Sequence, residues 1–218
     1  PYRRQRQMCI RDSAYTSQVG AVAIPLRYDE VDPSLIDTNP VRCPDVATAA
    51  EMERLIKRVK ADGDTIGGIV TCVATGVPVG LGEPVYGKLS ARLAEAMMGI
   101  NAAKGFDYGT GFDVASMLGS QIIDPFETDS EGHIVTTRNH SGGIQGGISN
   151  GSPIYFRVAF KPVATLMREV PTVDDEGNPA ILKAAGRHDP CVVPRAVPVV
   201  EAMTAITLLD SMILAGKY

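Results

Sequence analysis

Residues 154–160 read IYFRVAF, and this stretch is the strongest guide to the fold. The apolar residues Phe156 and Val158 alternate with Tyr155 and Arg157, so the two pairs lie on opposite faces of an extended chain. This period of two predicts a β-strand with one face toward an apolar core.

Further elements are expected on both sides of this strand. They are strands over 14–26 and 66–75, helices over 48–63, 90–103 and 198–215, a loop over 29–45 and a hairpin turn at 174–178. Thr48 and Glu51 have the spacing of a capping box, and Gly63 is expected to close that helix. The order of these elements shows no strict alternation of strands and helices, so it favours an α+β fold with antiparallel β-sheets.

The predicted last helix is apolar around most of its circumference. Val200, Met203, Ile206 and Leu209 are spread over several of its faces. A helix with this pattern is buried on more than one side, so we expect other elements to sandwich it.

The composition excludes several classes of protein. The chain has 218 residues, of which 44% are hydrophobic and 21% charged, which is typical of a folded domain and excludes global disorder. Its formal net charge of −4 argues against a general nucleic-acid-binding protein. Four cysteines and three histidines lack the spacing of a metal site or a disulfide framework, so we expect no metal.

The sequence favours a cytoplasmic protein that does not span a membrane. The uncharged stretch 65–82 is rich in glycine and contains Pro78, which is unlike a membrane-spanning helix. No apolar run follows the basic N-terminus, so no signal peptide is expected.

Residues 1–13 (PYRRQRQMCIRDS) contain four arginines and one aspartate and show neither helical nor strand periodicity. One interpretation is a basic arm that binds a nucleic acid or an acidic partner. We favour another, in which these residues are a non-native or disordered basic tail. Residues 14–218 are then expected to be the C-terminal part of a single domain.

Three stretches carry residues suited to binding an anion or a flat ring. The glycine run at 139–147 lets backbone N–H groups approach a ligand closely, but it fits a packed hairpin equally well. Lys161, at the end of the 154–160 strand, is well placed for a phosphate, although exposed strand-end lysines are common. An arginine such as Arg187 can hold a phosphate or carboxylate through two hydrogen bonds, and an aspartate such as Asp189 can take or relay a proton. A simple turn with a structural ion pair explains this last cluster equally well.

Several longer motifs occur in a fixed order. They are GDTIGG (63–68), GVPVGLGEPVY (76–86), MGINAAKGF (98–106), GFDVASMLGS (111–120), NHSGGIQGGISNG (139–151), FKP (160–162) and GRHDPCVVPRAVPVVEAM (186–203). In this order and spacing they resemble the C-terminal part of the chorismate synthase family, from about Ala14 almost to the end of the chain. The resemblance implies a β-α-β sandwich, in which antiparallel β-sheets enclose central helices, truncated at its N-terminus and assembled as a homotetramer.

The resemblance also implies an activity, that of a carbon–oxygen lyase in the shikimate pathway to aromatic amino acids. Its substrate, 5-enolpyruvylshikimate 3-phosphate, loses phosphate and a C6 hydrogen in an anti-1,4-elimination that gives chorismate. The reaction requires reduced FMN without net redox change. Whether the protein reduces the flavin itself, with NADP as the nicotinamide partner, or depends on an external reductase stays open.

The resemblance further implies which residues bind the flavin. They are Asn101, Ala102, Gly146, Lys161, Pro162, Val163, Ala164, Thr165 and Arg187. Asn101 and Ala102 are expected at the end of the second predicted helix, and Arg187 also faces the substrate. Asp189 matches an aspartate near flavin N5, so Asp189 and Arg187 are the expected catalytic residues. The family more often has hydroxyl residues at 163–165, so this loop is expected to rely more on backbone contacts.

The chain departs from the family at its front. It lacks a GESHG-like histidine segment, an arginine-rich substrate region, a second catalytic histidine and an RSSARET-like FMN loop. His140 and His188 belong to other motifs and do not replace those histidines. We therefore expect this chain alone to form little or no chorismate when assayed with reduced FMN. The alternatives are a flavin-binding fragment or an oligomerisation fragment, each without catalysis.

Overall fold

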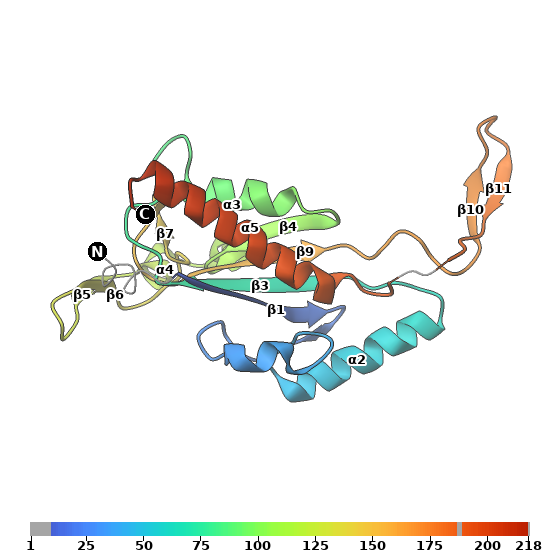
Figure 1. Cartoon of the computed structure of the whole chain (residues 1–218), viewed down its shortest axis with the longest axis horizontal. Coiled ribbons are helices and arrows are strands. Elements are labelled where there is room, and N and C mark those ends of the chain that lie inside the picture. The colour runs from blue at the N-terminus through green and yellow to red at the C-terminus, as the bar shows by residue number, and fades with distance from the viewer. Residues whose placement is uncertain (1–9, 187–188, 218) are drawn as a thin grey trace. The chain divides into compact units, whose positions relative to one another are not determined.

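The computed structural model of the protein describes residues 10–186 and 189–217 (Figure 1). Its helices are α2 (Val46–Ala61), α3 (Leu89–Met98), α4 (Gly119–Ile122) and α5 (Val193–Leu214), with the 3-10 turns η1 (Pro33–Thr38) and η2 (Gly111–Ser116). Its strands are β1 (Arg11–Val19), β2 (Val22–Ala23), β3 (Gly68–Thr75), β4 (Ala103–Tyr108), β5 (Phe126–Thr128), β6 (Ile134–Thr136), β7 (Ile144–Gln145), β8 (Ile148–Ser149), β9 (Ile154–Phe160), β10 (Val170–Val173) and β11 (Pro179–Leu182). This mixture of helices and strands is the predicted α+β class.

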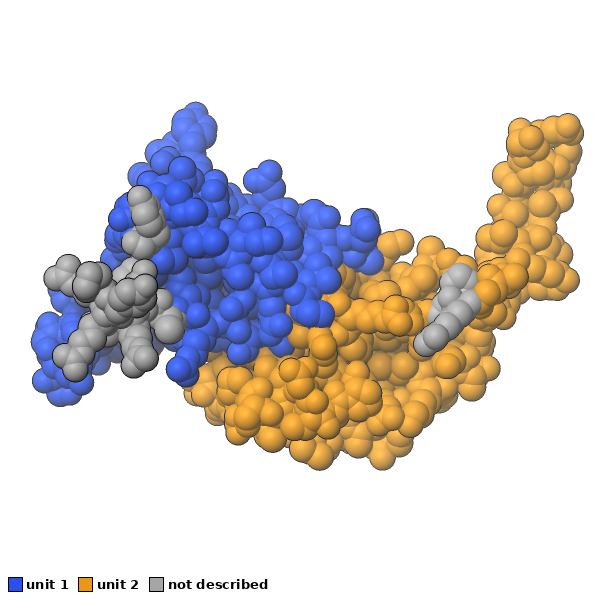
Figure 2. All heavy atoms as spheres, in the orientation of Figure 1, with its two compact units in different colours: residues 1–14, 71–158, 198–218 blue, residues 15–70, 159–197 orange. Residues whose placement is uncertain are grey.

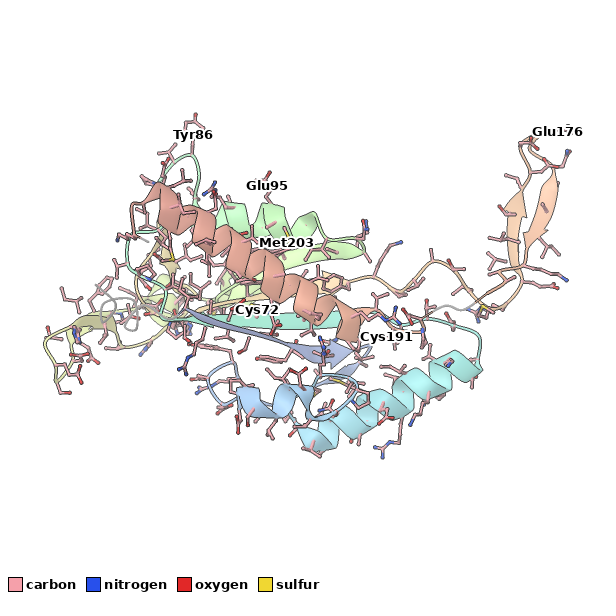
Figure 3. The ribbon with its side chains drawn as sticks, viewed as in Figure 1. Cys72, Tyr86, Glu95, Glu176, Cys191 and Met203 are labelled. Carbon is pink, nitrogen blue, oxygen red and sulfur yellow. The ribbon has the colours of Figure 1, made fainter. Side chains whose placement is uncertain are left out.

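Five strands of the described chain form the largest sheet, in the order β2-β1-β3-β9-β4. The pairs β5–β6, β7–β8 and β10–β11 are separate antiparallel hairpins, and β1 and β2 also pair antiparallel. In β10–β11 the register pairs Val170 with Leu182 and Val173 with Pro179, so the turn lies over 174–178 as predicted. Figure 3 shows Glu176 at the tip of this hairpin.

The chain divides into two compact units (Figure 2). The first takes in the described residues up to Ala14, Thr71–Val158 and the described residues from Pro198 onward. The second takes in Tyr15–Val70 and Ala159–Val197. The division falls within β1, β3, β9 and α5, so the two ends of each of these elements belong to different units.

In the second unit, α2 begins earlier than predicted. Its N-cap is Asp45, whose carboxylate accepts the backbone N–H of Thr48 at 2.8 Å, so Thr48 lies inside the first turn. The predicted capping box of Thr48 and Glu51 is therefore wrong. Aspartate is a better N-cap than threonine, which explains why the helix starts at the earlier candidate. Hydrogen bonds from Thr48 lower the pKa of Asp45.

The end of α2 follows the prediction. Gly63 has a φ of 67°, and its N–H donates to the carbonyl of Lys60 at 3.1 Å. The N–H of Asp64 donates to the carbonyl of Val59 at 3.0 Å. This pair of bonds is a Schellman motif, which needs a left-handed residue at the position of Gly63. Gly63 closes the helix, as predicted.

Replacing the N-cap tests where α2 begins. We expect Asp45→Ala to lower the free energy of unfolding by about 1 kcal/mol, because the N–H of Thr48 loses its acceptor. Glu51→Ala is the matched control: Glu51 is exposed, and its truncation is expected to change the stability by less than about 0.5 kcal/mol. Urea unfolding measures the stability of both variants. A larger loss of stability in Glu51→Ala than in Asp45→Ala would support the capping box instead of the Asp45 cap.

The core of the first unit gathers side chains from strands and helices. β9 alternates as predicted, with Phe156 and Val158 fully buried. In α3 the side chains of Leu89, Leu93 and Met97 are fully buried on one face. Each such side chain stabilises the fold by about 1.5–3 kcal/mol relative to an exposed one.

Helix α5 is tied to the rest of the first unit by polar contacts. Arg92 of α3 forms an ion pair with Asp210 of α5 at 2.7 Å, so the two helices lie side by side (Figure 1). The hydroxyl of Thr204 in α5 lies 3.5 Å from the thiol of Cys72 in β3. α5 therefore packs against both a helix and the sheet of this unit.

Helix α5 departs from its prediction in two respects. It begins at Val193, with Pro198 inside it rather than at its start; Pro194 stands in the first turn, where proline costs no hydrogen bond. Ile206 and Leu209 are more than half exposed, so the described residues cover one side of α5 rather than enclosing it. By length and apolar composition alone, α5 is the one helix of the described chain that would reach across a membrane.

Strand β1 begins at Arg11 rather than at Ala14. The carbonyl of Arg11 accepts a hydrogen bond from the hydroxyl of Thr75 at 3.3 Å. The tail expected over 1–13 therefore overlaps a strand at its end, and residues 1–9 lie outside the described residues.

Three cysteines of the described chain, Cys43, Cys72 and Cys191, are buried. Burial raises the pKa of each thiol, and that of Cys72 to about 12. A buried thiol with a raised pKa stays protonated at neutral pH and is chemically inert.

Candidate functional site

A cavity of about 1200 Å³ lies within the first unit, large enough for a cofactor-sized ligand. Its walls come from α3, β4, η2, α4 and the loop that carries β7. The lining is largely apolar and includes Phe106, Phe112, Phe126 and Ile144. No lysine or arginine of the described chain lines it, so the cavity suits an uncharged flat group better than a phosphate.

The glycine run 139–147 forms one wall of this cavity. β7 and β8 pair around the turn Gly146–Gly147, and φ is 60° and 90° at these two residues. A side chain at Gly146, which lines the cavity, would meet no protein atom within 4 Å. Gly147 is tightly packed, since a Cβ there would lie 2.5 Å from the side chain of Lys88. The run is therefore a packed hairpin with one glycine open to the cavity, which combines the two alternatives that the sequence left open.

A buried carboxylate holds the start of this run. Asp124 is only 6% exposed, and it accepts the backbone N–H groups of His140 and Ser141, each at 2.8 Å. Burial acts to raise the pKa of Asp124, but the hydrogen bonds from Ser141 and His140 outweigh burial and lower that pKa. The stability gained from the carboxylate is thus fully present above the ordinary carboxyl pKa, and it is lost as the pH falls through the lowered value.

Two more polar groups line the cavity, and both have protein partners. His140 Nδ1 lies 3.1 Å from the hydroxyl of Thr110, whose N–H donates to the carbonyl of His140 at 2.9 Å. Asp107 accepts two hydrogen bonds from Arg157, at 2.9 and 2.6 Å, and these raise the pKa of Arg157. Polar groups fixed in this way are typical of a ligand site that is largely pre-formed.

Asn101 and Ala102 do not end a helix, contrary to the prediction. α3 stops at Met98, and the two residues form the turn into β4. Ala102 has a φ of 71°, a left-handed conformation that residues other than glycine rarely adopt. The sequence misleads here because Ile100 continues the apolar stripe of the helix up to the point where the chain reverses. Neither Asn101 nor Ala102 is among the residues that line the cavity.

In the second unit, two predicted binding segments lie side by side. The hydroxyl of Thr65 donates to the carbonyl of Val163 at 2.6 Å. The N–H of the next residue, Ile66, donates to the carbonyl of Pro190 at 2.8 Å. Pro190 follows Asp189 directly. The loop after β9 and the loop before α5 are therefore hydrogen-bonded to two adjacent residues, Thr65 and Ile66.

The predicted charged residues of the second unit have different surroundings. Lys161 follows β9 directly and is exposed. Asp189 forms an ion pair with Arg195 at 2.7 Å, so an ion pair does exist in the polar cluster, with an arginine of α5. Arg187 lies outside the described residues, so its predicted roles stay predictions.

The sequence of the chain matches one protein family. The profile of the family described as chorismate synthase matches residues 4–213. The chain belongs to the chorismate synthase family. The match begins ahead of Ala14, inside the segment that we interpret as a tail.

Individual members of the chorismate synthase family agree with this assignment. Chorismate synthase of Parabacteroides distasonis is 61% identical over 209 residues, which cover 96% of this chain and 58% of the relative. That of Bacteroides fragilis is 58% identical with the same coverage. A crystal structure of a chorismate synthase matches with a TM-score of 0.76 and 28% identity, covering 95% of this chain and 57% of that one. The predicted family and fold are confirmed, and the chain spans a little over half the length of these relatives.

Sequence reasoning missed the cavity in this member of the chorismate synthase family. Its aromatic side chains Phe106, Phe112 and Phe126 come from separate elements, and no periodicity links them. Asp124 was missed because its partners follow it by 16 and 17 residues. Of the three stretches that the sequence suggested for binding an anion or a flat ring, the glycine run is the one whose described residues line this cavity.

Proposed function

We propose that this chain is part of a chorismate synthase and contributes to the binding of reduced FMN and of 5-enolpyruvylshikimate 3-phosphate. The whole protein would act as a lyase of the shikimate pathway, releasing phosphate and a C6 hydrogen to give chorismate. Membership of the family, with 61% identity to a chorismate synthase, supports this activity. The chain covers 58% of that relative, so the activity is proposed for the whole protein.

The observation that carries the proposal is the open face of Gly146. Gly146 lines the cavity, and a Cβ added to it would meet no protein atom within 4 Å, so glycine leaves open space beside the place proposed for the ligand. Aromatic walls and the absence of lysine and arginine from the described lining suit the ring of a flavin. When bound, reduced FMN supplies electron density for the elimination.

The second unit carries side chains suited to the charged parts of the reaction. Lys161 is an exposed cation directly after β9, and we assign it to a phosphate. The carboxylate of Asp189, held by Arg195, is assigned to relaying the C6 proton. The backbone of Val163, fixed by Thr65, is assigned to flavin contact. Arg187 is assigned to both substrate and flavin.

The proposal extends to the assembly and to the chain on its own. It includes a homotetramer in the cytoplasm. Because the family's histidine and arginine motifs are absent from this sequence, the 218-residue chain alone is proposed to bind flavin with little turnover.

Flavin titration of a Gly146 variant tests the proposal. We expect Gly146→Ala to raise the dissociation constant for reduced FMN about tenfold or more, because the methyl group enters the space proposed for the ligand. Quenching of flavin fluorescence measures binding of the oxidised form, and anaerobic titration measures that of the reduced form.

Gly132→Ala is the matched control for this variant. Gly132 also has a positive φ, 86°, and no atom within 4 Å of an added Cβ, but it does not line the cavity. Both variants are expected to lose about 1–2 kcal/mol of stability from the left-handed backbone. Equal flavin affinity in the two variants would refute the assignment of Gly146.

A further inference from the structure

Asp124 is a buried carboxylate that accepts hydrogen bonds from two successive backbone amides. It follows α4 and lines the cavity, and its two oxygens accept the N–H groups of His140 and Ser141 separately. A carboxylate that receives charge-assisted bonds from two successive amides fixes both the position and the direction of the chain.

The two amides stand where the glycine run begins. Within the run, the side chain of Asn139 accepts the N–H of Gly143 at 2.7 Å and donates to the carbonyl of Pro153 at 2.8 Å. The carbonyl of His140 accepts the N–H of Thr110. These bonds tie the run to the residue before β9 and to the turn after β4, whereas Asp124 ties it to the loop between α4 and β5. Gly146 follows Ser141 by a few residues, so its position depends on these anchors.

We propose that Asp124 is a positioning residue: its carboxylate holds the start of the glycine run against the loop between α4 and β5 and so sets where Gly146 meets a ligand in the cavity. The identity of that ligand, reduced FMN, rests on the proposed function. The anchoring of the run does not, because it is a property of the chain without ligand.

The variant Asp124→Asn tests this role with minimal change of shape. An asparagine accepts one of the two N–H groups and presents its own NH₂ to the other, so one amide loses its acceptor. In amide hydrogen exchange of the full 218-residue chain, we expect exchange within 139–147 to speed up about tenfold. We expect the dissociation constant for reduced FMN to rise about tenfold, and the thermal midpoint to fall by a few degrees because a buried amide is left without its acceptor.

Asp129→Asn is the matched control. Asp129 likewise accepts two backbone N–H groups, from Glu131 at 2.8 Å and His133 at 2.9 Å, but it does not line the cavity. This variant is expected to speed exchange over 129–133 alone and to leave the affinity for FMN unchanged. A merely structural effect of losing an aspartate would appear in both variants.

Each outcome of these measurements has a defined meaning. If exchange within 139–147 is the same in Asp124→Asn as in the unsubstituted chain, the inference is overturned. Faster exchange with unchanged FMN affinity overturns the link to Gly146. Failure of the unsubstituted chain to bind FMN contradicts the proposed function, and the exchange result still decides the anchoring.

A measurement on the unsubstituted chain covers the case in which Asp124→Asn does not fold. The amides of His140 and Ser141 are then expected to exchange at least about tenfold more slowly than in an unstructured peptide. Exchange at unstructured rates would overturn the inference.

Discussion

Phe156→Ala is expected to lower the free energy of unfolding by about 3–5 kcal/mol. Phe156 is fully buried in β9, and its ring centroid lies 5.4 Å from that of Phe106. Truncation removes apolar contact area, and the neighbouring side chains refill the space only in part. Since folded domains are stable by about 5–15 kcal/mol, this one change removes a large share of the total.

Urea unfolding followed by far-ultraviolet circular dichroism measures this loss. Phe112→Ala is the control, because the same truncation is made at a ring that is 78% exposed. We expect the control to change the stability by less than about 0.5 kcal/mol. If Phe156→Ala lost as little unfolding free energy as the control, the side chain of Phe156 would not be part of the buried core.

Gly142→Ala is expected to lower the free energy of unfolding by about 2–5 kcal/mol. The left-handed backbone, with a φ of 62°, costs an alanine about 1–2 kcal/mol. An added Cβ would lie 2.4 Å from the backbone nitrogen of Gly109, and such overpacking costs about 1–3 kcal/mol more. Gly109 does not yield freely, because its N–H donates to the carbonyl of Tyr155 at 3.0 Å.

The same glycine run supplies the control for Gly142→Ala. Gly146 has nearly the same φ, 60°, but an added Cβ there meets no atom within 4 Å, so Gly146→Ala is expected to lose only about 1–2 kcal/mol. Urea unfolding of both variants separates backbone strain from steric contact. Equal losses would contradict the tight approach of Gly142 to Gly109.

Short-range signals in the sequence predicted the local elements well. The alternation over 154–160 predicted β9, and Gly63 predicted the end of α2, because each depends on residues that are neighbours in sequence. The predicted start of α2 was wrong because Asp45 and Thr48 are both acceptable N-caps. The choice between them depends on which residue has its side chain placed to accept a backbone N–H of the first turn in the folded chain.

The candidate site was harder to predict because tertiary structure creates it. The glycine run was correctly singled out, yet its partner Asp124 precedes a proline and looks like part of a turn. Ala102 carries no sign in the sequence of its left-handed backbone. Local patterns singled out the glycine run and Lys161 but fitted ordinary turn and surface residues equally well, and the family resemblance then assigned Gly146 and Lys161 to the flavin.

The enclosed thiols make the chain a reporter of its own opening. Iodoacetamide reacts with the thiolate, and at pH 8 a group with a pKa of about 12, such as Cys72, supplies almost none while it stays enclosed. Alkylation of this residue therefore waits for a transient opening that lets solvent in. The rate of carbamidomethylation of Cys72, followed by mass spectrometry, therefore measures how often the chain opens around this thiol, with no dye or denaturant in the sample.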